Sequence, residues 1–381
     1  MINVLLTYTT LIPSVRFCAL YPLEYLAKNK DINLISKTSH KVTSADLNLC
    51  DVLVMVRCCE DRELEIAQKC KKTGRKLVYV LDDDLLNVPE SIECHKYYSI
   101  QALRDNMTGI MQISDVLWSP NPNLIKKYGN MFDKCVIIDE PFIGNIKLKE
   151  QTNEEVRIGF AGTETHRAFI DGFLGNVLKS VKYIYKDKVS IEFFGFKPDF
   201  LKEIEGVYIP YCDNYEQYCS IMRERNWDIG LAPLEQSEFA SCKYFNKYIE
   251  YSSYGIVGVY SDVQPYVFGI KDKINGILAE NTVEGWINAI RMLIEDKELL
   301  NKISQFAQEE LQTKFNVESV AEKIYDKEVF VKCSKNDTIE YKKKFFFAEK
   351  LKIYTQVYGV YTLVIILNRA YKKIMGIIRR H

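Results

Sequence analysis

The feature that most constrains the fold is an alternation of short apolar runs with amphipathic stretches of helical length, and this alternation occurs twice. In the first half of the chain, apolar and β-branched runs predict strands at residues 3–7, 32–35, 52–56, 76–81, 116–118 and 135–138. Helical periodicity between them predicts helices at residues 15–27, 62–71 and 97–113. Nearly continuous apolar strands separated by helices are typical of a parallel sheet that is covered on both faces.

The alternation stops at Glu140-Pro141-Phe142 and at the polar stretch 147–155, which together resemble a linker, and then restarts. The second array has predicted strands at 156–161, 189–194, 207–209, 228–232 and 256–260. Its predicted helices lie at 216–224, 242–254, 283–295, 298–313 and 317–325. Two such arrays in series predict an α/β protein with two Rossmann-like, doubly wound domains facing a cleft. We expect a first domain at 1–145, a second at 151–330 and a tail at 331–381.

Composition and simple motifs exclude several classes of protein. With 381 residues, the chain is long enough for about two domains, and 47% hydrophobic with 27% charged residues is an ordinary globular composition. The longest strongly apolar stretch, 357–367, is about half the length that a membrane-spanning helix needs. The first residues read as a strand rather than a signal peptide. The eleven cysteines and four histidines lack metal-site spacing, which favours reduced thiols, a cytoplasmic location and no metal centre.

Common nucleotide and hydrolase motifs are absent from the sequence. Neither array begins with G-x-G-x-x-G, which disfavours dinucleotide binding, and no G-x4-G-K-[ST] supports a P-loop. No G-x-S-x-G marks a serine hydrolase.

A charged stripe is predicted on the helix that follows the buried run 228–232. Lys243, Lys247, Glu250 and Tyr254 are spaced at i, i+4, i+7 and i+11, which places them on one helix face. Two lysines and a helix N-terminus can neutralise a diphosphate, and a carboxylate further along can accept hydrogen bonds from ribose hydroxyls. The alternative is a solvated face with an ordinary Lys247–Glu250 pair, and the pattern alone leaves both readings open.

The run 239–266, which contains Lys243, Lys247 and Glu250, resembles the donor-site segment of GT-B-fold glycosyltransferases. It is most similar to the bacterial branch related to family 4 of these enzymes. Asn275-Gly276 and Glu284-Gly285-Trp286 continue the resemblance, and the run 158–166 resembles the first strand and glycine-rich turn of the family's second domain. The resemblance covers residues 150–330 in detail and the first 150 residues only in architecture.

The resemblance implies a role for each matched position. Glu250 would bind the donor ribose, Lys243 and Lys247 would hold the diphosphate, and Gly162 with Thr163 would let the donor approach the backbone. The family's motif has a first acid eight residues before Glu250, and Cys242 stands there instead. The resemblance therefore does not determine how this chain would hold the donor sugar, or whether the reaction would retain the configuration of the sugar. A nucleotide sugar would be the co-substrate, and enzymes of this fold usually dispense with a metal.

Several other residues are candidates for the chemistry. Asp82-Asp83-Asp84 follows a predicted strand, and Asp83 or Asp84 is a candidate general base for an acceptor hydroxyl. His166 follows the glycine-rich turn and is a candidate partner of the leaving phosphate. Ser14 and Arg16 are candidates for the acceptor side of the cleft. The alternatives are a capping role for the aspartates, a structural histidine and an exposed helix cation.

The tail has a charge of its own. Residues 341–381 contain ten Lys or Arg and a single acid, Glu349, with interleaved Phe and Tyr, whereas the rest of the chain has an acidic excess. Such a stretch suits the surface of an anionic membrane, and docking on another subunit of a homo-oligomer is the alternative. Nucleic-acid binding is disfavoured because no recognition module accompanies the charge.

Together these features predict a glycosyltransferase that uses a nucleotide sugar and a hydroxyl acceptor. The expected acceptor is a glycan or lipid-linked sugar of a bacterial surface polysaccharide or glycolipid, at the cytoplasmic face of the membrane. Two rivals remain open: a nucleotide-sugar epimerase or hydrolase with the same donor pocket, and a non-catalytic, membrane-tethered protein that binds sugar nucleotides. The cysteine at position 242 is the best argument for the second rival.

Overall fold

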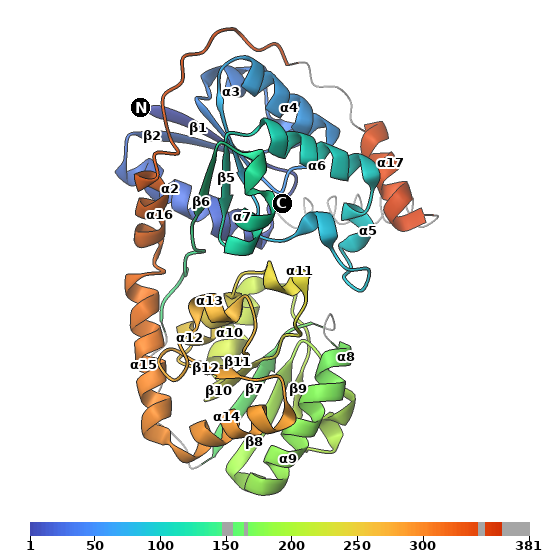
Figure 1. Cartoon of the computed structure of the whole chain (residues 1–381), viewed down its shortest axis with the longest axis vertical. Helices are drawn as coiled ribbons and strands as arrows, with labels where there is room; N and C mark the ends of the chain where they lie inside the picture. The colour runs from blue at the N-terminus through green and yellow to red at the C-terminus, as the bar shows by residue number, and fades with distance from the viewer. Residues whose placement is uncertain (147–154, 164–166, 342–346, 360–381) are drawn as a thin grey trace, which may run out of the picture.

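The structure is a computed structural model that describes residues 1–146, 155–163, 167–341 and 347–359. It consists of two α/β domains, one above the other along the longest axis of the molecule (Figure 1). Each domain is built on a six-stranded sheet whose paired strands are all parallel. The predicted arrangement of two doubly wound sheets is therefore confirmed.

The first sheet has the strand order β2-β1-β3-β4-β5-β6. Its strands are β1 (Ile2–Tyr8), β2 (Ile32–Thr38), β3 (Val52–Val56), β4 (Lys76–Val80), β5 (Val116–Ser119) and β6 (Lys134–Ile137). Alternate residues face two separate cores: Leu53 packs into one and Val54 into the other. Both faces are apolar because helices cover both, which is why the strands read as continuous apolar runs.

Helices of the first domain connect these strands and cover the sheet. They are α1 (Pro13–Val15), α2 (Tyr21–Asn29), α3 (Ser44–Leu49), α4 (Asp61–Lys72), α5 (His95–Tyr98), α6 (Gln101–Ile113) and α7 (Pro122–Tyr128), with a π-helical turn, η1 (Arg16–Leu20), between α1 and α2. The predicted helix at 15–27 thus contains this π-helical turn, and the predicted helix at 97–113 is divided into α5 and α6.

The second sheet has the order β12-β11-β10-β7-β8-β9. Its strands are β7 (Val156–Ala161), β8 (Val189–Phe194), β9 (Val207–Ile209), β10 (Ile229–Ala232), β11 (Val257–Ser261) and β12 (Ile277–Ala279). Its helices are α8 (Arg167–Phe169), α9 (Gly175–Tyr185), α10 (Tyr215–Arg225), α11 (Glu238–Ser241), α12 (Asn246–Ser253), α13 (Tyr266–Gly269), α14 (Val283–Glu295) and α15 (Lys297–Thr313).

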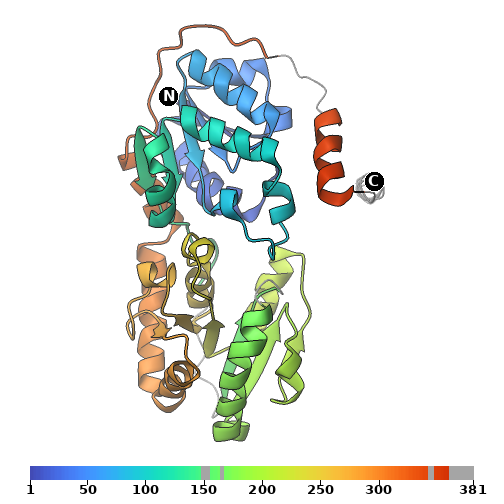
Figure 2. The same cartoon turned by 45° about the vertical axis from the view of Figure 1, so that its right-hand side comes forward.

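After α15 the chain returns to the first domain. Helix α16 (Val317–Asp326) packs against α2, and its Val320, Ala321 and Ile324 belong to the core below the first sheet. The chain thus passes between the domains twice, near Phe142 on the way out and near Phe315 on the way back. The amide of Phe142 donates to the carbonyl of Phe315 at 2.7 Å and so holds the two connections together. Figures 1 and 2 show α15 and α16 along one side of both domains. By order along the chain, we had assigned residues 317–330 to the second domain; α16 instead packs on the first.

Residues 331–341 lie as an extended segment on the first domain, where Asn48 and Ser44 hydrogen-bond the backbone of Ile339 and Tyr341. This segment leads toward helix α17 (Phe347–Tyr358), which lies beside α5 (Figure 2). The rest of the basic tail lies outside the described residues. Within the part of the chain that the structure describes, no helix combines the length and the apolar character that crossing a membrane requires.

Candidate functional site

A cavity of about 750 Å³ lies between the two domains, lined by residues of both. On the first-domain wall, Arg57 follows β3, and Asp82 and Asp83 come shortly after β4. On the second-domain wall, Gly162 follows β7 and Pro233 follows β10. The carboxyl ends of both sheets therefore meet at this cavity. The order of strands reverses between β7 and β10, and such switch points are where open parallel sheets bind ligands.

Gly162 and Thr163, which we predicted to bind the donor, form part of the second-domain wall of the cavity. A Cβ at Gly162 would come within 2.7 Å of the ring of Phe160, so a side chain cannot be added here without moving that ring. The bare backbone leaves space for a ligand to approach the end of β7. His166, which we predicted near this turn, lies outside the described residues.

Lys243, Lys247 and Glu250 all line the cavity, but they do not share one helix as predicted. Helix α11 ends at Ser241, and α12 begins only at Asn246, after Phe245 with φ −82° and ψ 47°. The side-chain amide of Asn121, from the first domain, donates to the carbonyls of Ser241 and Lys243. The predicted helix at 242–254 is therefore wrong at its start, because a side chain of the other domain takes up carbonyls in the segment where the helix would have begun.

On α12 the lysine and the carboxylate are in direct contact. Lys247 Nζ lies 2.5 Å from Glu250 Oε2, and the hydroxyl of Tyr218 donates to Glu250 Oε1. Tyr218 comes from α10, and its ring stacks on Phe194 with centroids 4.8 Å apart. The i,i+3 pair of the alternative reading is thus present, and both of its side chains line the cleft. Tyr218 fixes the orientation of the Glu250 carboxylate.

The first-domain wall carries a cluster of charges around Arg57. Its guanidinium donates to both carboxylate oxygens of Asp82, at 2.6 Å for Nη2 to Oδ2, and Nη2 also lies 2.7 Å from Asp83 Oδ2. Arg57 has a left-handed backbone, φ 53°, which is uncommon for a residue with a side chain and occurs often at functional sites.

The two aspartates differ in their electrostatics. Burial alone would raise the pKa of Asp82, but the charge and hydrogen bonds of Arg57 outweigh burial and lower it below the ordinary value. Burial raises the pKa of Asp83, the attraction of Arg57 opposes this, and the negative charge of Asp82 adds to it. Asp82 is therefore held as a carboxylate by Arg57, while Asp83 takes up a proton more readily.

Glu140 is a buried carboxyl group in the same cluster. It is 6% exposed, lines the cavity, and accepts a hydrogen bond from Cys18 Sγ at 3.4 Å. Burial, with the nearby charge of Asp82, raises the pKa of Glu140 to about 8. We had read this residue as part of a linker, and a single glutamate before a proline carries no sequence signal of such an environment.

Cys18, Asp82 and Glu140 place their ligand atoms within 4.8 Å of one another, close enough to hold a metal ion. Two observations disfavour that role. The guanidinium of Arg57 already supplies a cation to both oxygens of Asp82. Burial and the neighbouring Glu140 also raise the pKa of Cys18, which disfavours the thiolate that binds metals. The cluster is better suited to holding protons than to holding a cation.

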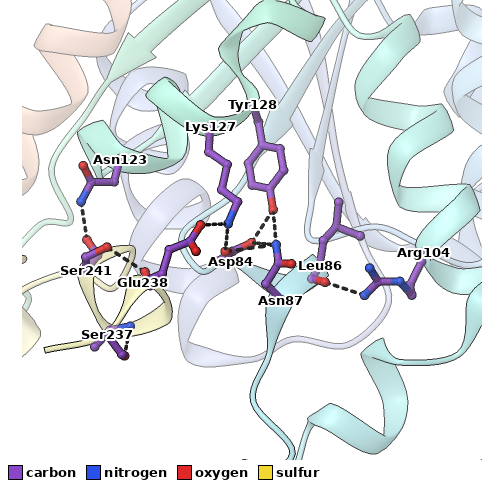
Figure 3. Close-up of polar contacts among 11 residues, drawn as sticks. Asp84, Leu86, Asn87, Arg104, Asn123, Lys127, Tyr128, Ser237, Glu238 and Ser241 are labelled. Carbon is purple, nitrogen blue, oxygen red and sulfur yellow. Dashed lines mark hydrogen bonds and ion pairs between the residues drawn. The ribbon is translucent and has the colours of Figure 1, made fainter. Parts of the chain in front are cut away.

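Asp84, predicted as a candidate base, does not line the cavity. It is fully buried, and its oxygens accept hydrogen bonds from Tyr128, from Asn87 at 3.0 Å and from Lys127 at 2.8 Å (Figure 3). Lys127, on α7, also pairs with Glu238, on α11 of the second domain. The structure therefore places Asp84 in a polar network that reaches the other domain.

The other residues named from the sequence lie in the cavity, at the surface and in the core. Ser14 lines the cavity and its hydroxyl helps to hold Asp82 as a carboxylate. Arg16, at the start of η1, is exposed and does not line the cavity. Cys242 is 2% exposed and packs with the core of the first domain, so the position of the family's first acid faces away from the cleft.

Four residues of the site were missed from the sequence: Arg57, Asp82, Glu140 and Tyr218. Asp82 lies within the aspartate run, and only the choice among its three members was missed. No periodicity marks the others, because each depends on chain segments that meet only in the folded protein.

Comparisons with known proteins give a consistent answer about the fold. No protein-family model matches the chain, and no curated protein matches its sequence. Among solved structures, it is similar to HepE of Anabaena in complex with UDP and glucose, with 13% identity and a TM-score of 0.58 over 86% of this chain and 99% of that one.

Two further solved structures are similar to this chain to nearly the same degree. An α-glucosyltransferase in complex with UDP and a DNA 13-mer has 14% identity and a TM-score of 0.57, over 85% of this chain and 98% of that one. A glycosyltransferase from Rickettsia africae has 16% identity and a TM-score of 0.56, over 86% and 98%. The protein therefore has the GT-B fold.

Proposed function

We propose that this GT-B protein is a glycosyltransferase that moves a sugar from a nucleoside-diphosphate sugar to a hydroxyl group of an acceptor. The observation that carries the proposal is the convergence of Lys243, Lys247 and Glu250 with the bare backbone of Gly162 on one wall of the interdomain cavity. The similar solved structures with bound UDP support the choice of a nucleotide sugar as donor.

The donor would bind to the second-domain wall. Lys243, just before α12, and Lys247, in its first turn, neutralise the diphosphate, and the N-terminus of α12 adds the positive end of its dipole. Glu250, held by Tyr218 and Lys247, accepts hydrogen bonds from the ribose. These groups favour the charge that develops on the leaving nucleoside diphosphate, so no metal ion is required for that task.

The acceptor would approach from the first-domain wall. In the reaction, the bond between the anomeric carbon and the phosphate oxygen breaks and a bond to the acceptor oxygen forms. The acceptor hydroxyl gives its proton to Asp83, whose raised pKa makes it a better base than an ordinary aspartate. Arg57 keeps the carboxylate of Asp83 in place.

The biological setting is a finer part of the proposal. We propose that the acceptor is a glycan or lipid-linked sugar of a bacterial surface polysaccharide or glycolipid, and that residues 341–381 bring the enzyme to the cytoplasmic face of an anionic membrane. The support is the basic and aromatic composition of that stretch, most of which lies outside the described residues.

A thermal-shift screen with UDP-, GDP- and dTDP-sugars tests the donor site. A ligand at about 100 times its Kd stabilises the native state by about 2.7 kcal/mol, so one nucleotide class is expected to raise the Tm clearly. Glu250→Gln and Lys243→Ala are expected to weaken that ligand by about 10- to 100-fold, because each removes a charged hydrogen-bond partner. Glu298→Gln, at a position 79% exposed on α15, is the matched control.

Asp83→Asn separates binding from transfer. This variant is expected to bind the donor as the wild type does and to lose about 10²- to 10⁴-fold in transfer rate, as the loss of a general base predicts. Release of the nucleoside diphosphate, with and without added acceptors, is the measurement. Turnover that needs no acceptor would identify a hydrolase instead, and the absence of any nucleotide-induced shift in the wild type would refute the donor site.

A further inference from the structure

A second cavity, of about 460 Å³, lies in the first domain beneath helix α17. Its volume is within the range of about 300–1,000 Å³ that is usual for small-molecule sites. Neither the lysines nor the glutamate of the proposed donor site line it. It is therefore separate from the nucleotide pocket.

The position of this cavity in the sheet is that of a ligand site. Thr9 and Thr10 directly follow β1, and Arg57 directly follows β3; all three line the cavity. In the order β2-β1-β3-β4-β5-β6, β1 and β3 are the strands between which the direction of winding reverses. The carboxyl ends of strands at such a reversal form a crevice, because the helices that follow them leave toward opposite faces of the sheet.

The two cavities meet at Arg57, which lines both of them. Asp83, the proposed base, is bonded to the same guanidinium at 2.7 Å. The second cavity therefore lies on the other side of the Arg57 side chain from the place where the proposed base and the donor sugar would meet. An acceptor bound there would be next to the proposed base, as glycosyl transfer requires.

The walls of the cavity combine aromatic surface with a few polar groups. Tyr97 and Tyr98 pack edge to face with centroids 5.0 Å apart, and Ile353 and Val357 of α17 add aliphatic surface to the lining. Among the polar groups, the carboxylate of Glu60 is 7% exposed and accepts from Tyr97 at 3.3 Å. Thr9 and Thr10 add hydroxyl groups.

This combination selects among ligand classes. A hydrocarbon chain would bury the exposed charges of Glu93 and Lys96 without replacing their water, which is costly. A second phosphate group is disfavoured because Glu60 and Glu93 offset Arg57 and Lys96. A pyranose ring fits both kinds of wall, since its carbon faces pack on aromatic rings and its rim of hydroxyls hydrogen-bonds carboxylates and hydroxyls.

Helix α17 supplies a wall of the cavity from the far end of the chain. Ile353 is 9% exposed and Val357 is half-buried, and both pack against the core above the first sheet. Their spacing of four residues puts them on one face of α17, toward the domain. The neighbouring Thr355 and Gln356 are exposed.

We propose that the cavity beneath α17 binds a sugar ring of the acceptor, so that the acceptor is a glycoside and α17 is a wall of its site. This inference rests on the proposed glycosyl transfer for its direction, but binding of a glycoside can be measured without turnover. The C-terminal segment then contributes to acceptor recognition.

Saturation-transfer NMR with millimolar p-nitrophenyl glycosides of glucose, galactose, mannose and N-acetylglucosamine tests the inference. We expect at least one glycoside to bind the full-length wild type. Val357→Trp and Thr10→Trp, which fill the cavity from α17 and from the loop after β1, are expected to weaken that binding at least about tenfold. Gln356→Trp, on the exposed side of α17, is the matched control and keeps wild-type binding.

The outcomes separate this inference from the donor proposal. If the wild type binds a nucleotide such as UDP but none of the four glycosides, the acceptor cavity is refuted and the donor site stands. Equal binding by Val357→Trp, Thr10→Trp and Gln356→Trp would place the glycoside elsewhere, and an equal signal from p-nitrophenol alone would show selection of an aromatic group rather than a sugar. If a glycoside binds as expected but no nucleotide does, the cavity stands and the donor proposal fails.

Discussion

At the scale of single residues, the first-domain wall of the cleft brings four ionisable groups into a small volume. Arg57 compensates Asp82 and Asp83, and Glu140 remains as a buried carboxyl beside them. Two carboxyl groups next to one guanidinium can both be ionised. Ionisation of a third carboxyl group in the same low-dielectric space is disfavoured. Burial, with the added charge of Asp82, therefore raises the pKa of Glu140 from its ordinary 4.5 to about 8.

This shift predicts a pH-dependent stability. Because the folded state holds the proton of Glu140 more tightly than the unfolded state, its contribution is fully present below pH 4.5 and is lost as the pH rises toward 8. Glu140→Gln cannot lose a proton, so we expect its unfolding free energy to rise relative to wild type across that window. The gain is up to about 1.4 kcal/mol per pH unit.

Urea denaturation at several pH values measures this difference. Glu298→Gln, which is exposed, should show a gap to wild type that does not change over the same window. A constant gap for Glu140→Gln as well would mean that Glu140 titrates normally in the folded protein.

At the scale of elements, the contact between α7 and α11 positions the loop that carries Lys243. Side chains of α7 and of the residue before it, Asn123 and Asn121, donate to the carbonyl of Ser241 at 2.9 Å each. Lys127 connects the buried Asp84 to Glu238, and Figure 3 shows this polar contact between the two domains. The bend between α11 and α12, and with it the approach of Lys243 to the cavity, is thus stabilised from the first domain.

The two carboxylates that Lys127 contacts should differ in their effect on stability. Lys127→Met leaves Asp84 buried with Tyr128 and Asn87 as its remaining partners, and we expect a loss of about 2–4 kcal/mol in unfolding free energy. Glu238→Gln removes an exposed partner and should cost less than about 0.5 kcal/mol. Chemical denaturation of both variants measures the difference.

The double variant Lys127→Met/Asp84→Asn provides the control for this prediction. Removing the buried charge together with its partner should recover part of the loss. If Glu238→Gln were as destabilising as Lys127→Met, the main contribution of Lys127 to the unfolding free energy would come from its exposed pair with Glu238. Its contact with the buried Asp84 would then contribute little.

At the scale of the whole molecule, the chain leaves the first domain once and returns to complete it. Helix α16 fills the core below the first sheet, so the first domain is not finished until residue 326 and the segment after it are in place. The two crossings are paired by the bond from Phe142 to Phe315, and Lys323 pairs with Asp139 at 3.0 Å. The cleft is therefore bordered by two adjacent connections, which limits how the domains can move.

A substitution in α16 should consequently act on the first domain. Ile324→Ala removes a fully buried side chain, and we expect a loss of about 2–5 kcal/mol, with faster amide exchange in α2 and β1. Hydrogen exchange read by mass spectrometry locates the effect. Phe306→Ala, at a position 42% exposed on α15, is the control and should leave both domains protected. Faster exchange in α14 with α2 unchanged would assign α16 to the second domain instead.

The sequence by itself determined the class of fold and four residues of the second-domain wall of the cavity. Both follow from local patterns: apolar runs such as 52–56 and 229–232 form strands wherever helices cover both faces, and Gly162, Lys243, Lys247 and Glu250 come from short stretches next to such strands. The helix start at Asn246 was misplaced because Asn121, more than a hundred residues earlier, bonds the carbonyls in front of it.

Only the tertiary structure decided which aspartates face the cleft, which domain α16 completes and where the second cavity lies. Asp83 and Asp84 are adjacent in sequence, yet one lines the cavity and the other is buried against Tyr128 and Lys127. Arg57, Glu140 and α17 reach the site from three distant parts of the chain. Such groups acquire their role from neighbours that are absent in any local window, so burial and pairing, rather than spacing, set their chemistry.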